Sequence, residues 1–344
     1  MEFFTKIDIP RPGFGIDYTK KLAFFGSCFA DNISAQFENR GFCTLSNPFG
    51  TVYNPVSLAA QVKAVAEGKV FGEQDVFQDG CWNRDGQKWR GDRDQEYRRA
   101  QDARGPWHCW DAHGSLSGKT REECLGKLNA ATKQAREFLQ QADVVFITLG
   151  TAFVYFLNAC GSTDGGTCGR VVANCHRQDP KMFERRLISV EETADAIRRI
   201  VESLHSLSPT TNIVFTVSPL RHMADGAHQN SLSKATLMLA IGKAPYFPSY
   251  EIVMDELRDY RFYDSDMVHL SETAEEYIFE RMVDTYCNDT TKANIAKVEK
   301  FLKSANHRIV DVASPATAEF QKKLAAQAAS LEKQIPGLVL NTEN

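Results

Sequence analysis

Residues 21–30 read KLAFFGSCFA, a pattern typical of the start of an α/β fold. The run from Leu22 to Phe25 is apolar and predicts a short buried strand, and Gly26 predicts a tight turn into a helix. This arrangement would lift Ser27 out of the carboxyl edge of a sheet, where its hydroxyl can meet a ligand. The predicted helix has one apolar face, with residues spaced four apart: Phe29, Ile33 and Phe37.

Two other apolar runs, residues 144–149 and 213–217, are rich in β-forming residues and predict buried central strands. Helix-start signals fall before, between and after these two runs, with a serine or threonine at each cap: Thr120, Ser189 and Ser271. Strands alternating with helices predict a three-layer α/β/α sandwich with a mainly parallel sheet. Ligands of such sheets lie outside the carboxyl ends of the strands, so Ser27, residues 150–151 and residues 218–222 should share one edge.

The chain has 344 residues, 43% of them hydrophobic, which suffices for one large or two ordinary domains. We expect one α/β domain over residues 1–289 and a helical C-terminal extension over residues 290–344 that packs or forms homo-oligomers. The alternation of strands and helices is interrupted over residues 72–118. This segment is either an ordered surface insertion or a wall beside a substrate. All four tryptophans lie in this insertion: Trp82, Trp89, Trp107 and Trp110.

The formal net charge of −4 argues against nucleic acid or an anionic membrane as a partner. The first residues show no basic segment followed by an apolar run, so we expect no signal peptide, and no stretch approaches the length of a transmembrane helix. The nine cysteines follow no regular framework. Free thiols in a reducing cytoplasm are the simplest interpretation.

Asp266 and His269, near the other end of the chain, are the partners that a nucleophilic serine needs. A serine hydroxyl is a weak nucleophile until a base takes its proton, and a third group must orient that base. The spacing lets Asp266 hold one ring nitrogen of His269 while the other nitrogen faces Ser27. We therefore expect Ser27, His269 and Asp266 to form a catalytic triad.

Each of these roles has an alternative. Ser27 could be an ordinary helix cap. Cys28 is a rival nucleophile, although its side chain is expected to turn inward as a buried structural cysteine. His222 is a competing base, for which substrate binding is the preferred role, and Asp264 could replace Asp266 as the orienting group.

The chain resembles the GSCFA family, a bacterial group related to the SGNH hydrolases, and residues 26–30 spell the family name. A serine early and an Asp-x-x-His late is the chain order typical of SGNH hydrolases. The likeness covers most of residues 20–287. Further stretches carry it in one order: NPFGTVYNP at 47–55, TLGTA at 148–152, VVANCH at 171–176, FTVSPLRH at 215–222, YFPSYE at 246–251 and DELRDYRFY at 255–263.

The resemblance implies an SGNH-type serine esterase that acts on an acyl ester, such as an acetyl group on a carbohydrate, and needs no metal or organic cofactor. It also implies an oxyanion hole built from the Ser27 amide, Gly50 and a third donor. In SGNH hydrolases that third donor is an asparagine, but Ala152 stands at its place here. The candidates to replace it are Thr151, Asn54 and Asn174. The expected substrate-binding residues are Asn174, His176, Arg221, His222, Trp110 and His113.

Three other interpretations stay open. A sugar hydroxyl in place of water as the acceptor would make the protein a glycan O-acyltransferase. Ala152 is the feature that favours a non-catalytic glycan-binding protein with the same fold. A zinc site is disfavoured because the spacings are long and no Cys-x-x-Cys pair occurs among its possible ligands: Cys160, Cys168, Cys175 and His176.

Overall fold

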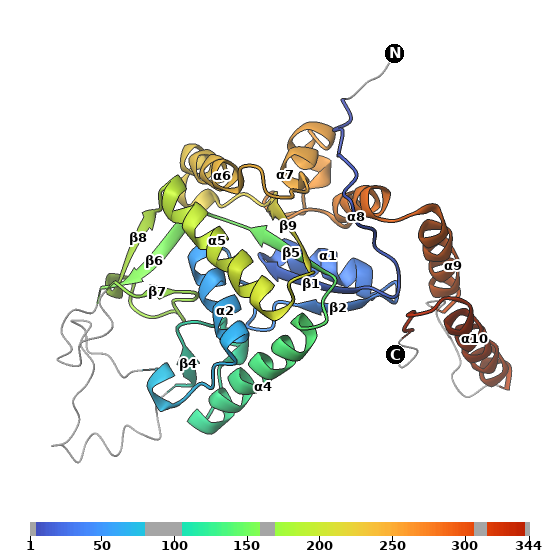
Figure 1. Cartoon of the computed structure of the whole chain (residues 1–344), viewed down its shortest axis with the longest axis horizontal. Helices are drawn as coiled ribbons and strands as arrows, with labels where there is room; N and C mark the ends of the chain where they lie inside the picture. Colours follow the sequence, from blue (N-terminus) through green and yellow to red (C-terminus); the bar gives the residue numbers. More distant parts are fainter. Residues whose placement is uncertain (1–4, 80–104, 159–168, 306–314, 341–344) are drawn as a thin grey trace.

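The computed structural model describes residues 5–79, 105–158, 169–305 and 315–340. Its centre is a four-stranded sheet in the order β2-β1-β5-β9, in which all neighbouring strands run parallel (Figure 1). This is the strand order of a doubly wound α/β sheet. The strands are β1 (Lys21–Gly26), β2 (Cys43–Ser46), β5 (Val144–Leu149) and β9 (Asn212–Val217).

Helices cover both faces of the sheet (Figure 1). On one face Leu22 and Phe24 of β1 pack with α1 and α8, and on the other Ala23 and Phe25 pack with α2, α4 and α5. Successive strand residues point to opposite faces, so one short apolar strand supplies both cores. The predicted α/β fold with a mainly parallel sheet is confirmed. The helices are α1 (Cys28–Glu38), α2 (Pro55–Glu67), α4 (Arg121–Leu139), α5 (Val190–Leu207), α6 (Ala227–Ile241), α7 (Ser249–Glu251) and α8 (Glu272–Tyr286).

Two of the predicted helix caps show how local chemistry sets the helix starts. Ser189 accepts the Glu192 amide at 3.1 Å and Glu192 accepts the Ser189 amide at 2.8 Å, a complete capping box. Thr120 also accepts the amide of Glu123 at 3.1 Å. The Glu123 carboxylate, however, accepts the amide of Lys119 at 2.8 Å instead of closing the box on Thr120.

Two small antiparallel sheets lie beside the main one. Trp110 stacks on Phe77 with ring centroids 3.8 Å apart, and both join Leu157 and Val172 of the other small sheet in one apolar cluster. Trp82 and Trp89 lie outside the described residues. The strands are β3 (Val76–Gln78) with β4 (Trp107–Cys109), and β6 (Phe153–Leu157) between β7 (Val171–Val172) and β8 (Phe183–Leu187).

The C-terminal helices α9 (Asp289–Ala305) and α10 (Pro315–Gln334) follow α8 on one side of the molecule (Figure 1). Ile295 and Val298 of α9, and Leu338 beyond α10, join the same core as α1 and α8. Val339 donates to the carbonyl of Gly41 at 3.0 Å. Across the described part of the chain, no helix combines the length and apolarity that a membrane span requires.

Candidate active site

Ser27 occupies the sharp turn between β1 and α1. Gly26 before it has φ +125°, and a Cβ there would lie 1.9 Å from the carbonyl oxygen of Thr148, so only glycine fits. The Ser27 amide donates to the same carbonyl at 3.2 Å. Ser27 is 1% exposed, and its Oγ has no hydrogen-bond partner among the residues that the structure describes.

The free hydroxyl of Ser27 is unusual for its position. It stands at the N-cap of α1 with an extended backbone, yet its side chain makes no capping hydrogen bond. The cap side chains of α2, α4, α5 and α8 all accept a backbone amide. Buried polar groups in proteins are normally hydrogen-bonded. A spare hydroxyl beside the uncapped, partially positive start of a helix therefore makes Ser27 a candidate for a functional role.

Cys28, the rival nucleophile, is half-buried, not fully buried as expected, and packs against the core beneath α1. Burial raises the pKa of its thiol. Because the thiolate is the reactive form, this shift disfavours Cys28 and leaves Ser27 as the better candidate.

Asp266 and His269 lie on a tight loop between Tyr263 and Leu270, which form an antiparallel bridge. Asp266 Oδ2 lies 2.5 Å from His269 Nδ1, while Asp266 Oδ1 accepts the amides of Val268 and His269, each at 2.8 Å. These hydrogen bonds, that of the His269 ring first, lower the pKa of Asp266 to about 2. The ionised carboxylate accepts the Nδ1 proton of His269, so Nε2 is the nitrogen left to act as a base.

The structure does not join Ser27 Oγ to His269 by a hydrogen bond, and the His269 side chain is 52% exposed. The loop that carries His269 nevertheless contacts the loop after β9, because Arg221 donates to the carbonyl of Met267. Burial, and then the positive charges of Lys234 and Arg185, lower the pKa of His222 to about 4.

His222 is the other base that this edge of the sheet offers. Its ring lies 5.4 Å from that of Tyr53, and its Nε2 is buried without a partner in the described part of the chain. A general base must become positively charged, and the surroundings that lower the pKa of His222 oppose that charge. Since His269 has a carboxylate to stabilise its cation, it is better suited to the role.

Arg221 was expected at the substrate, and within the described residues its side chain contacts the loop that carries His269. One guanidinium nitrogen donates to the carbonyl of Met267, which has a left-handed backbone with φ +58°. The guanidinium also lies 4.7 Å from the ring of Tyr263 and 5.6 Å from that of Tyr260. Arg221 therefore connects the loop after β9 to the turn that carries Asp266.

The expected oxyanion donors have partners within the protein. The Ser27 amide donates to Thr148, and the Gly50 amide to Asn47 at 2.7 Å. The Thr151 hydroxyl lies 3.0 Å from Ser233 Oγ and accepts the amide of Phe153 at 3.1 Å.

The two asparagine candidates differ from each other. Asn54 caps α2 through its oxygen and donates its amide nitrogen to Ser57 Oγ at 3.1 Å. Asn174 accepts the amide of His176 at 2.7 Å through its side-chain oxygen only. Of the two, Asn174 is the one whose amide nitrogen makes no hydrogen bond to the described residues.

Trp110 and His176 were expected to touch substrate, but both are buried, at 4% and 7% exposure. Trp110 stacks on Phe77, and His176 Nε2 lies 2.8 Å from the carbonyl oxygen of Cys109. Packing inside the small sheets keeps both side chains from a ligand at the main sheet edge. His113 packs directly on Gly50, where a Cβ would approach the His113 Cβ to 2.3 Å.

The polar face of α6 was not predicted from the sequence. Its buried side chains reach the loops around the site: Asn230, Ser233 and Lys234. The spacing of these residues in the sequence is the signal that could have predicted this face. They share one helical face with Leu237 and Ile241, and a lysine on such an apolar stripe is exceptional.

The family model of the GSCFA family matches residues 21–282, more than half of the chain. The chain belongs to the GSCFA family. The matched range runs from β1 into α8, so it includes Ser27, Asp266 and His269. A search of curated proteins finds no match for this GSCFA protein.

Among solved structures, this GSCFA protein is similar to an acetyl xylan esterase (Est2A) from the rumen bacterium Butyrivibrio proteoclasticus. The identity is 16% and the TM-score 0.31. The alignment covers 78% of this chain and 63% of the esterase chain, so the GSCFA protein spans less than two thirds of that structure.

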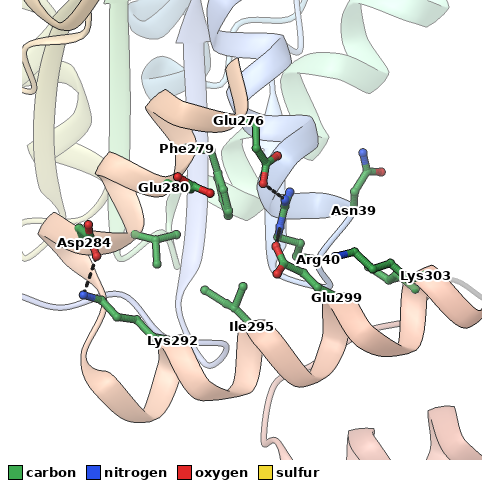
Figure 2. Close-up of a pocket in the computed structure, with 12 residues that line it drawn as sticks. Asn39, Arg40, Glu276, Phe279, Glu280, Asp284, Lys292, Ile295, Glu299 and Lys303 are labelled. Carbon is green, nitrogen blue, oxygen red and sulfur yellow. Dashed lines mark hydrogen bonds and ion pairs between the residues drawn. The ribbon is translucent and has the colours of Figure 1, made fainter. Parts of the chain in front are cut away.

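The GSCFA protein also has a surface groove of about 860 Å³ between the end of α1, α8 and α9 (Figure 2). Arg40 lies between Glu276 and Glu299, at 2.6 and 2.7 Å, which links α1 to both helices. The groove lies at the opposite end of α1 from Ser27, about 16 Å away at 1.5 Å per residue. Its charged and apolar lining suits helix packing and offers no nucleophile.

The described residues contain no group of three or more His, Cys, Asp or Glu side chains placed to hold a metal ion. Cys160 and Cys168, two of the four possible zinc ligands, lie outside the described residues. Burial raises the pKa of Cys175, a third, to about 11, and the fourth, His176, is engaged with Cys109.

Proposed function

We propose that this GSCFA protein is a serine esterase of SGNH type, with an acetyl ester of a carbohydrate as its substrate class. The observation that carries the proposal is Ser27 Oγ, buried and without a partner among the described residues at the start of α1. The Asp266–His269 pair supports it, since that pair has the contacts a catalytic base requires.

In the proposed reaction Ser27 Oγ attacks the ester carbonyl carbon as His269 Nε2 takes the hydroxyl proton. The carbonyl oxygen becomes negative and faces the first-turn amides of α1, which Ser27 leaves uncapped. The C–O bond of the ester then breaks, and the leaving alcohol takes the proton from His269. Water attacks the acyl-serine in the same way, and the acid and free Ser27 are released.

The open Ser27–His269 distance is compatible with this scheme, because catalytic hydrogen bonds in unliganded enzymes are often long and tighten in the substrate complex. His269 is exposed on a short loop. The scheme requires His269 Nε2 to come within hydrogen-bond reach of Ser27 Oγ when substrate binds. Asp266 then stabilises the imidazolium that forms.

A non-catalytic glycan-binding protein is the second candidate. It is favoured by the internal partners of the expected oxyanion donors, in particular the Gly50 amide and the Thr151 hydroxyl. An active enzyme needs such donors, because one of them is typically worth about 3–4 kcal/mol in the transition state.

Labelling with a fluorophosphonate probe, combined with hydrolysis of 4-nitrophenyl acetate and acetylated oligosaccharides, tests the proposal. We expect Ser27→Ala to abolish both labelling and turnover, and Cys28→Ala, its matched neighbour, to retain most of both. Labelling that survives Ser27→Ala would overturn the assignment of Ser27 as the nucleophile. If the wild-type protein binds glycans but is neither labelled nor active, the glycan-binding function replaces the esterase function.

A further inference from the structure

Among the charged residues that the structure describes, Lys234 of α6 is the least exposed, at 1%. Its Nζ donates to the carbonyl of Gly150 at 2.6 Å and to that of Ser218 at 2.7 Å. Gly150 directly follows β5 and Ser218 directly follows β9. One side chain therefore connects the carboxyl ends of two neighbouring strands, at the edge where Ser27 lies.

The neighbours of Lys234 on α6 extend this connection. Ser233 Oγ accepts the amide of Ala152 at 2.8 Å and contacts the Thr151 hydroxyl. Asn230 accepts the amide of His222 at 2.9 Å. Side chains within about one turn of a single helix thus hold the loops after both strands.

A buried lysine is costly, and no carboxylate forms an ion pair with Lys234 in the described part of the chain. Burial lowers its pKa to about 7. Its two carbonyl partners accept two of the N–H groups on Nζ. Burial of a lysine is energetically unfavourable, and an apolar side chain of similar length would fill the same space in an ordinary core.

The link from Lys234 to Ser27 runs through β5. Thr148, two residues before Gly150, accepts the Ser27 amide at 3.2 Å. A shift of the β5 end would therefore move the groups around the Ser27 hydroxyl.

We propose that Lys234 is a positioning residue of the site: it ties the ends of β5 and β9 together and so fixes the loops that face Ser27. The inference rests on the proposed esterase function. It assigns Lys234 no contact with substrate and no proton transfer.

The test compares Lys234→Met with a matched control, Thr211→Val. The buried Thr211 hydroxyl donates to the carbonyl of Ala142 at 2.6 Å, which connects the same two strands at their opposite ends. Both variants should lower the urea midpoint. Only Lys234→Met should lower kcat for 4-nitrophenyl acetate, by about tenfold to a hundredfold, with KM changed less than twofold. Should Lys234→Met fail to fold, Lys234→Gln replaces it with the same expected loss of kcat.

Histidine NMR titration supplies a readout that does not depend on turnover. Since Lys234 helps to lower the pKa of His222, Lys234→Met should move that pKa toward its ordinary value, and Thr211→Val should leave it in place. If the wild-type protein turns over no ester, the esterase proposal fails, and this titration still judges whether Lys234 acts on the site. Equal kcat in wild type and Lys234→Met, or an unchanged His222 titration, overturns the inference.

Discussion

Asp266 Oδ2 lies 2.5 Å from His269 Nδ1, and the other oxygen of the same carboxylate accepts the backbone amides of Val268 and His269. The carboxylate therefore fixes both the ring and the backbone of one histidine. Three hydrogen bonds to the charged form explain why the pKa of Asp266 falls to about 2.

Asp266→Asn should lower kcat by roughly 10³–10⁴ with little change in KM, because an asparagine in this place favours the wrong histidine tautomer. Steady-state kinetics on 4-nitrophenyl acetate would measure it. Asp264→Asn is the matched control, since its carboxylate accepts the Ser265 amide and makes no hydrogen bond to His269. Equal losses in the two variants would contradict the assignment of Asp266.

Arg221→Met should lower kcat by about tenfold to a hundredfold, since a hydrogen bond from a charged group is worth roughly 1.5–3 kcal/mol and this one holds the histidine loop. Arg261→Met, at an exposed arginine near the same loop, should leave kcat unchanged. A rise in KM at constant kcat would instead mean that Arg221 binds substrate.

Gly26→Ala should destabilise the protein by several kcal/mol and abolish labelling of Ser27, because the new Cβ would lie 1.9 Å from a backbone oxygen. Gly126→Ala provides the contrast. Gly126 lies on an exposed face of α4, with nothing within 4 Å of the position of an added Cβ. The substitution should therefore raise the free energy of unfolding by about 0.5–1 kcal/mol. Urea unfolding measures both, and a mild effect of Gly26→Ala would contradict the proposed close turn.

His176 makes stability sensitive to acid. Burial, first, and the nearby His108 lower its pKa to about 4, below the ordinary value of 6.5. The unfolded chain therefore binds more protons between these values, and stability is lost as the pH falls through this window. Between pH 7 and pH 4.5, His176 should lower the free energy of unfolding by about 2–3 kcal/mol.

His176→Asn should reduce that acid loss in urea unfolding, and asparagine tolerates the left-handed backbone of φ +49° at this position. The exposed His205→Asn serves as the control and should keep the wild-type pH dependence. An identical pH slope in wild type and His176→Asn would show that the acid sensitivity has another source.

Several features predicted from the sequence depend on contacts between residues close in sequence. Gly26 sets the turn, and the apolar spacing of Phe29 and Phe37 sets the buried face of α1. Ser189 and Glu192 cap one helix because they stand three residues apart. The 2.5 Å contact within Asp266-x-x-His269 has the same basis, since its short spacing suffices to bring the carboxylate to the ring.

Tertiary structure alone decided which polar residues face the site. Trp110 and His176 matched motifs expected at a substrate, but the packing of two small sheets buried them. Lys234 lies far in sequence from Gly150, and only the docking of α6 brings its amine to that carbonyl. The sequence by itself therefore determined the turn at Gly26, the helix caps and the Asp266–His269 contact, whose interactions span a few residues. The surroundings of Ser27 depend on where distant elements pack, because burial and long-range hydrogen bonds exist only in the folded chain.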